Sequence, residues 1–160
     1  MPAYTQIVRD MSEAKFQEVF GVSIRKARET YLARHNIKAP KSVKKSLRAG
    51  AKNEARVVAL YAHLKTVDDD QMVEEIIRTW LLSRRDILGA ALDYLEIPHD
   101  NGLTESDDVD KLSKFSVDEL KPLVKALAET ASGDDIQIYL RFLWSACISL
   151  LESENVHRFH

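Results

Sequence analysis

The segment IQIYLRFLWSACISLL, residues 136–151, is apolar on nearly every side when it is drawn as a helix. Its polar residues recur at every fourth position and form one narrow stripe: Gln137, Arg141, Ser145 and Ser149. A surface helix of a globular protein shows a much broader polar face to water. We therefore expect this helix to be enclosed by other parts of its own chain or by a partner. Lipid is excluded, because the segment is shorter than the roughly 20 residues needed to span a bilayer and carries an arginine in its middle.

Helical spacing dominates the remaining sequence, and no segment alternates as a strand does. The chain has 160 residues, of which 45% are apolar and 30% charged, so it can bury a core of its own. We expect an all-α fold of about seven to eight short helices, arranged as a compact bundle or as stacked helical pairs. The whole chain, residues 1–160, is expected to form a single helical domain.

Capping residues predict where these helices begin and end. The predicted starts are Asp10 with Glu13, Ser23, the acidic run 68–70, Ser83 with Asp86, Ser116 with Glu119, and Asp134. Gly21 and Asn36 are predicted ends, since both residue types suit a helix terminus. Pro122 falls inside a predicted helix and indicates either a kink or a start nearer Lys121. The sequence PHDNG, residues 98–102, is typical of a turn.

A weak internal similarity appears when residues 64–81 are laid on residues 127–144, an offset of 63 positions. Several apolar positions then coincide, and Arg78 falls on Arg141. Such coincidences are common in helical sequences, so both a true repeat and chance agreement stay open. A repeat would favour stacked helical pairs, a scaffold commonly used for binding.

The two parts of the chain carry opposite charge. Residues 1–66 hold 14 Lys and Arg against 5 Asp and Glu, whereas residues 67–160 hold 9 against 20. This asymmetry predicts a basic N-terminal helical part, 1–66, that packs on or extends from an acidic C-terminal part, 67–160. Either the two parts attract one another, or the basic part contacts nucleic acid or an acidic partner.

The basic charge is concentrated in residues 25–56, where clustered cations would attract phosphates or carboxylates. The candidate contacts are Arg25, Lys26, Arg28, Arg34, Lys41, Lys44, Lys45, Arg48 and Lys52. The neighbouring sequence FQEVFGVSIRKARETYL, residues 16–32, superficially resembles a helix-turn-helix, with Gly21 in the turn and the basic segment as the reading helix. Gln17 and Thr30 depart from that pattern, at positions where a small and an apolar residue are usual.

The residues needed for common chemistries are missing or badly placed. The five glycines are too far apart to form a phosphate-binding loop, and no Gly-x-Ser-x-Gly sequence exists. Two Glu-x-x-His pairs, Glu96 with His99 and Glu154 with His157, resemble those of dinuclear metal bundles, but they fall at predicted helix ends. We therefore expect no metal, no cofactor and no catalytic residues.

Two further residues carry expectations of their own. Arg141 needs a carboxylate or several carbonyl groups around its guanidinium if it is buried, so it is a candidate for a buried ion pair. Cys147 is the single cysteine, which rules out an intrachain disulfide and favours a core role among apolar neighbours. Together with the absence of a secretory signal from the opening sequence MPAYTQIVRDM, this favours a cytoplasmic location.

The sequence therefore predicts a non-enzymatic helical protein-interaction module that can self-associate. The alternative is a small nucleic-acid-binding protein that uses the basic region 25–56. An enzyme is the third interpretation and depends only on the two Glu-x-x-His pairs.

Overall fold

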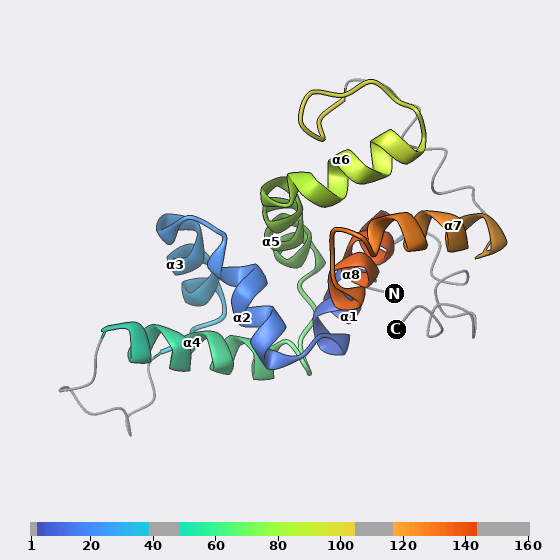
Figure 1. Cartoon of the computed structure of the whole chain (residues 1–160). Coiled ribbons are helices and arrows are strands. Elements are labelled where there is room, and N and C mark those ends of the chain that lie inside the picture. The colour runs from blue at the N-terminus through green and yellow to red at the C-terminus, as the bar shows by residue number, and fades with distance from the viewer. Residues whose placement is uncertain (1–2, 39–48, 105–116, 144–160) are drawn as a thin grey trace. The chain divides into compact units, whose positions relative to one another are not determined.

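A computed structural model describes residues 3–38, 49–104 and 117–143, and these residues confirm an all-α fold (Figure 1). Eight helices lie in these ranges: α1 (Ala3–Asp10), α2 (Glu13–Gly21), α3 (Arg25–Arg34), α4 (Ala49–His63), α5 (Asp70–Ser83), α6 (Arg85–Tyr94), α7 (Val117–Leu127) and α8 (Gly133–Leu143). The described ranges contain no strand, only an isolated bridge between Asp100 and Leu103. None of the helices described is both long and apolar enough to cross a membrane.

The chain divides into two compact units, Met1–Trp80 and Leu81–His160. This boundary differs from the one at residues 66 and 67 that charge alone suggested. The first unit carries 15 Lys and Arg against 10 Asp and Glu, a net charge of +5, and the second carries 8 against 15, a net charge of −7. The charge contrast between these two units is smaller than that between residues 1–66 and 67–160, because the acidic residues that begin α5 lie in the first unit.

In the first unit, α2 and α3 both pack against α4, as Figure 1 shows. Three aromatic rings pack between α2 and α4: the Phe16 ring lies 5.5 Å from that of Tyr61 and 5.7 Å from that of Phe20. The buried apolar residues of this unit are Ile7, Val8, Met11, Phe16, Val19, Phe20, Leu32, Leu60, Leu64, Met72, Val73, Ile76, Ile77 and Trp80. Met72, Val73, Ile76, Ile77 and Trp80 recur at helical spacing after the acidic run 68–70 and form the buried face of α5.

The first helix, α1, is not expected from the sequence. It is held to the α4–α5 connection by polar contacts. The buried hydroxyl of Thr5 accepts a hydrogen bond from the Asp69 amide at 3.1 Å and donates one to Asp70 at 2.8 Å. Arg9 Nε donates to the Leu64 carbonyl at 2.9 Å. These contacts explain why the predicted capping role of Asp10 is wrong: Asp10 is the last residue of α1.

The observed caps differ from most of the predicted ones. Ser12 caps α2 by accepting a hydrogen bond from the Lys15 amide at 3.1 Å. At α3 the N-cap residue is Ile24, and no side chain caps the helix, so the predicted cap at Ser23 is wrong. The two predicted ends are confirmed: α2 ends at Gly21, and Asn36, which has a left-handed φ of 55°, follows α3.

Beyond α4 the predicted starts fall one or two residues from the true ones. The acidic run does begin α5, where Asp69 accepts a hydrogen bond from the Met72 amide at 3.3 Å. Ser83 does not cap α6, because it is the last residue of α5 and Arg84 occupies the N-cap position. Ser132, not Asp134, caps α8 by accepting from the Asp135 amide at 3.3 Å. The capping prediction at Ser116 lies outside the described residues.

In the second unit, α6 packs against α7. Its buried apolar residues are Leu81, Ile87, Ala91, Leu92, Ile97, Leu123, Val124, Leu127, Ile136, Ile138, Tyr139 and Leu140. Helix α7 runs through Pro122, so a start near Lys121 is wrong. Of the apolar segment 136–151, the structure describes residues 136–143, and the first half of that range is largely buried, as expected.

The predicted turn at residues 98–102 is confirmed. The Asp100 amide donates to the Leu103 carbonyl at 2.8 Å, and the Leu103 amide donates to Asp100 at 3.0 Å. Asn101 and Gly102 both have positive φ, 49° and 88°, as a two-residue hairpin turn requires. Gly102 also lies against α6, since a Cβ there would come within 2.9 Å of the Leu88 Cβ. Space as well as conformation therefore favours glycine at this position.

Candidate functional site

The candidate site is a pocket of about 250 Å³ in the first unit, which we call the α3 pocket. Its lining comes from α2, α3 and α4: Phe20, Arg25, Arg28, Glu29, Leu32, Asn53 and Val57. Phe20 and Leu32 are buried and Val57 is half-buried, so they form an apolar base. The charged and amide side chains provide the polar part of the lining.

Helix packing places these residues together. Phe20 lies in the last turn of α2, and its ring is 6.4 Å from that of Tyr31 on α3. Asn53 and Val57 lie one turn apart on α4, against which α2 and α3 both pack. The α2–α3 connection is only three residues long, which brings the first turn of α3 close to the end of α2.

Two shielded polar atoms near the start of α3 lack hydrogen-bond partners within the described part of the chain. They are the Oγ of Ser23, a residue only 4% exposed, and the Nε of Arg28. Buried polar atoms usually have partners, and leaving one without a partner costs about 1–3 kcal/mol. Unsatisfied donors beside a pocket lined by cations suit an oxygen-rich ligand better than an apolar one.

The acidic residue of the pocket is already neutralised by a cation. Both oxygens of Glu29 accept from Arg56, at 3.1 and 3.0 Å. This hydrogen bonding, with the positive charge of Arg56, keeps the pKa of the Glu29 carboxyl below its ordinary value. Glu29 is therefore charged but paired, and Arg25 and Arg28 give the pocket a net positive character.

The α2–α3 connection, which lies in sequence between the pocket residues Phe20 and Arg25, carries two exposed apolar residues. Ile24 is 71% exposed and Val22 is 38% exposed. Single exposed apolar residues are common on proteins. Here, however, both residues lie within the same three-residue connection, directly before the arginine that begins α3. Apolar and cationic side chains are therefore adjacent in sequence at this position.

The structure brings only some of the predicted basic contacts together. Arg25 and Arg28 both line the α3 pocket, and Lys26 is exposed on the same helix. Arg34, at the other end of α3, pairs with Asp69, its Nε lying 3.0 Å from the carboxylate. The other predicted contacts are not tested by the structure. Lys41, Lys44, Lys45 and Arg48 lie outside the described residues, and the side chain of Lys52 is not described either.

The helix-turn-helix pattern is reproduced only in outline. Two helices joined by residues 22–24 do occupy the segment, but Gly21 ends α2 instead of forming the turn. Thr30 stands where such motifs have an inward apolar residue, and it is exposed, with its hydroxyl bonded to the Lys26 carbonyl at 2.9 Å. The face of α3 that carries Thr30 is therefore exposed, whereas the second helix of a helix-turn-helix would bury an apolar residue at this position.

A buried aspartate cluster in the first unit is not predictable from the sequence pattern. The side chain of Asp69 is 6% exposed, and its Oδ2 lies 2.8 Å from His35 Nε2 as well as near Arg34. Because a carboxylate only accepts, His35 Nε2 carries the proton in this contact. The His35 ring also meets that of His63 edge-on, with centroids 5.0 Å apart. The cluster joins the end of α3 to the start of α5 and is structural.

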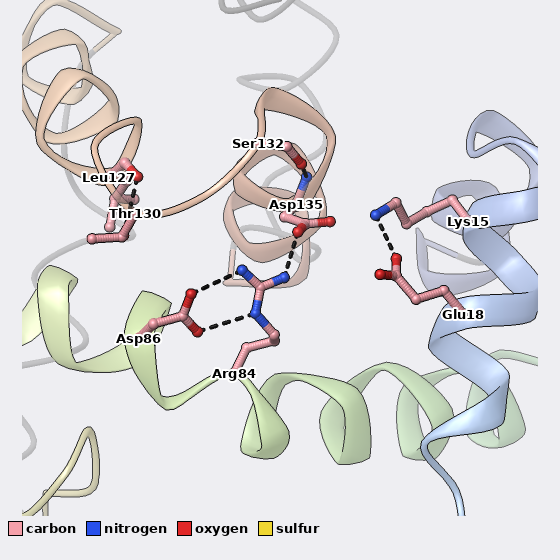
Figure 2. Close-up of polar contacts among 8 residues, drawn as sticks. All are labelled: Lys15, Glu18, Arg84, Asp86, Leu127, Thr130, Ser132 and Asp135. Atoms are coloured by element: carbon pink, nitrogen blue, oxygen red, sulfur yellow. Dashed lines mark hydrogen bonds and ion pairs between the residues drawn. The ribbon is translucent and has the colours of Figure 1, made fainter.

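The second unit has a comparable arginine cluster, drawn in Figure 2. Arg84 makes two hydrogen bonds to Asp86, at 3.0 and 2.9 Å, and a third to the buried Asp135 of α8. Hydrogen bonding to Asp86, followed by the contact with Asp135, raises the pKa of Arg84, and the same bonding lowers the pKa of Asp86. The sequence SRRD indicates a helix break, but nothing in it identifies Asp135 as the partner.

The residues considered for metal binding have other partners. His99 Nε2 lies 2.7 Å from Asp93, and His99 Nδ1 accepts from the Gly102 amide at 2.8 Å, so both ring nitrogens are engaged. Glu96 is exposed and has a left-handed φ of 58° just after α6. Within the described ranges no group of three or more His, Cys, Asp or Glu could hold a metal ion. The pair Glu154 and His157 lies outside the described residues.

The other two sequence candidates add little to the site. Arg141 lies half-buried in the last turn of α8, so its buried ion pair stays a prediction. Cys147 lies outside the described residues. Burial raises the pKa of Tyr139, two residues before Arg141, which keeps that phenol neutral. These observations identify no chemistry in α8.

Comparison with known protein families, with curated proteins and with solved structures found no match to this chain. The α3 pocket therefore has to be interpreted from its own residues.

Proposed function

We propose that the protein is a non-enzymatic helical interaction module that binds other proteins through the α3 pocket and the neighbouring α2–α3 connection. The observation that carries this proposal is Ile24, which is 71% exposed and directly precedes Arg25 of a pocket with an apolar base and two arginines. Protein interfaces combine apolar and aromatic contact with arginine in this way. The protein has a single cysteine and therefore no intrachain disulfide, so we also propose a cytoplasmic location.

Peptide selection tests this proposal even though the partner is unidentified. A random library of peptides displayed on phage is selected on the immobilised full-length protein. We expect enriched peptides whose affinity falls about tenfold or more with Ile24→Asp, since burying an isoleucine contributes about 1.5–3 kcal/mol. The matched control is Leu82→Asp, which changes an exposed leucine of the second unit. No enrichment, or equal loss with both variants, would contradict the proposal.

Self-association is a narrower form of the same proposal. If the exposed connection around Ile24 contacts a second copy, light scattering of the full-length protein will show a mass that rises with concentration. Ile24→Asp should then return the protein to a monomer. A strictly monomeric protein restricts the proposal to foreign partners.

Contact with nucleic acid is the second candidate function. It is supported by the exposed cations Arg25 and Lys26 on a helix that follows a short connection. Against it, Arg34 and Arg56 are already paired with carboxylates, which leaves fewer cations for a phosphate backbone. Mixed-sequence DNA or RNA should bind in dilute salt and dissociate steeply between about 50 and 200 mM salt if this candidate is correct. Absence of binding in dilute salt would remove it.

A further inference from the structure

We infer that the partner of the α3 pocket is an acidic protein segment that carries one apolar anchor residue. A carboxylate of this segment would lie at the start of α3, beside Arg25 and Arg28. The adjoining apolar side chain would enter the pocket over Phe20, Leu32 and Val57. This inference rests on the proposed function and adds the chemistry of the partner.

The charge around the pocket favours an acidic partner. Both carboxylate oxygens of Glu29 accept from Arg56, which lies outside the lining and balances the charge of Glu29. Glu29 also interacts electrostatically with Arg25 and Arg28, but these two arginines leave the surroundings of the pocket with a net positive charge. The Nε of Arg28 is shielded from water and lacks a hydrogen-bond partner among the described residues. Arg28 lines the pocket, so its guanidinium can donate a charge-assisted hydrogen bond to a carboxylate there, which is about twice as strong as a neutral one.

The start of α3 offers further donors for the same carboxylate. The first amides of a helix have no partner within the helix, and no side chain caps α3. Their positive dipole end attracts an anion, as it does at phosphate and carboxylate sites of other helices. The shielded Ser23 hydroxyl lies two residues before α3 and is also without a partner in the described ranges. Ser23 does not line the pocket, so two kinds of donor are available at the start of α3: its first amides and the guanidinium groups of Arg25 and Arg28.

The size of the pocket favours a side chain over a small-molecule cofactor. Its volume of about 250 Å³ is below the range of about 300–1,000 Å³ that is usual for small-molecule sites. One large apolar side chain of a partner therefore fits the space, with its backbone remaining outside.

A peptide carries these two features better than a nucleic acid does. The apolar base of Phe20, Leu32 and Val57 lies beside the cations, so a ligand must present an apolar group next to its anion. A phosphate backbone presents a row of anions at regular spacing and offers no apolar side chain for that base. Nucleic acid is therefore kept as an outcome of the test.

The test uses a fluorescein-labelled synthetic peptide of twelve residues, in which one central leucine is flanked by Asp and Glu. Its binding to the full-length protein is followed by fluorescence anisotropy in dilute buffer. Two comparison peptides replace the acids by Asn and Gln, or the leucine by Ser. We expect each comparison peptide to bind about tenfold more weakly, because one loses charge-assisted hydrogen bonds and the other loses apolar burial.

Protein variants locate the binding site. Arg28→Gln and Arg25→Gln should each weaken binding of the acidic peptide about tenfold. The matched control is Lys26→Gln, which removes an exposed cation of the same helix that does not line the pocket, and we expect it to stay within about twofold. Arg28→Lys keeps the positive charge but removes the Nε donor, so its loss of affinity should lie between about twofold and about tenfold. Thermal unfolding of every variant shows whether the fold is retained.

The outcomes separate this inference from the proposed function. No binding of the acidic peptide, equal binding of its amide counterpart, or no effect of Arg28→Gln in a folded variant would overturn the inference. Displacement of the peptide by mixed-sequence DNA at lower concentration than by unlabelled peptide would also overturn it. If the phage-selected peptides depend on Ile24 but are not acidic, this inference fails and the proposed function stands. If no selected peptide depends on Ile24, the proposed function fails first.

Discussion

The starts of α5 and α8 offer a direct comparison between the two units. The two helices begin at Asp70 and Gly133, and their capping residues, Asp69 and Ser132, are separated by the same 63 positions as the weak similarity in sequence. Each cap accepts a hydrogen bond from the amide three residues later. Each helix start also contains a buried aspartate that pairs with an arginine.

The two starts divide these roles differently. In α5 one residue has both roles: Asp69 caps the helix and also pairs with Arg34 and His35 at the end of α3. In α8 a serine caps the helix, and Asp135 is left to pair with Arg84. Similar positions in sequence therefore need not carry the same interaction. At the start of α5, substitution of Asp69 should remove the cap and the ion pairs together. At the start of α8, substitution of Ser132 should remove only the cap, and substitution of Asp135 only the ion pair.

The largest expected effect is the loss of Asp69. Asp69→Ala removes the cap and leaves Arg34 and His35 without their carboxylate, so we expect the free energy of unfolding of the first unit to fall by about 3–4 kcal/mol. Asp135→Ala should cost the second unit less, about 1–2 kcal/mol, because Arg84 retains Asp86. Hydrogen exchange of the α5 and α8 amides measures each unit separately.

Matched controls for these variants lie beside them in sequence. Asp68 and Asp134 are both exposed, and Asp68→Ala and Asp134→Ala should each change stability by less than about 1 kcal/mol. If Asp68→Ala, which removes only an exposed ion pair with Arg9, were as harmful as Asp69→Ala, the effect would not be specific to the Asp69 cluster. Equal losses at Asp69 and Asp135 would contradict the proposed division of roles.

The next effect concerns the cap alone. Ser132→Ala should destabilise α8 by about 1 kcal/mol, the usual cost of losing a serine N-cap, while the Arg84–Asp135 pair stays intact. Ser132→Asp should retain most of the stability, since aspartate caps as well as serine does. Urea unfolding of the two variants in parallel makes this measurement. A larger loss for Ser132→Asp than for Ser132→Ala would show that negative charge beside Asp135 outweighs capping.

The smallest expected effect depends on pH. Arg84 holds the pKa of Asp86 below its ordinary value, so this pair stabilises the folded state above about pH 4, and the contribution is lost as the pH falls through the lowered pKa. Asp86 is 42% exposed, so the contribution is well below that of a buried pair. Asp86→Asn should lower stability slightly at pH 7 and remove that part of the acid dependence. An unchanged acid dependence in Asp86→Asn would assign it to other carboxyl groups.

Apolar spacing is sufficient to predict most of the fold. Residues such as Ile76, Trp80 and Leu92 recur at helical intervals and are buried, and this spacing can be read from the sequence without knowledge of distant contacts. Helix ends marked by Gly21 and Asn36 are also predictable, since their conformational preferences are local. The all-α class follows from these local rules.

Polar partners are not predictable in the same way, because they depend on which residues the fold brings together. Thr5 contacts Asp70 across 65 positions, and Arg84 contacts Asp135 across 51. Helix α1 is not predictable from the sequence either, because its position depends on polar contacts with the distant α4–α5 connection. For the α3 pocket, the sequence indicates Arg25 and Arg28 through their charge, but not that Phe20 and Val57 lie beside them.

The hairpin turn after α6 has a consequence for spectroscopy. The Gly102 amide donates to His99 Nδ1, so that nitrogen must be unprotonated and the ring must carry its hydrogen on Nε2, facing Asp93. Imidazole nitrogen resonances should therefore report a single tautomer for His99. This makes one ring a built-in reporter of whether the second unit is folded, without any added label near its core.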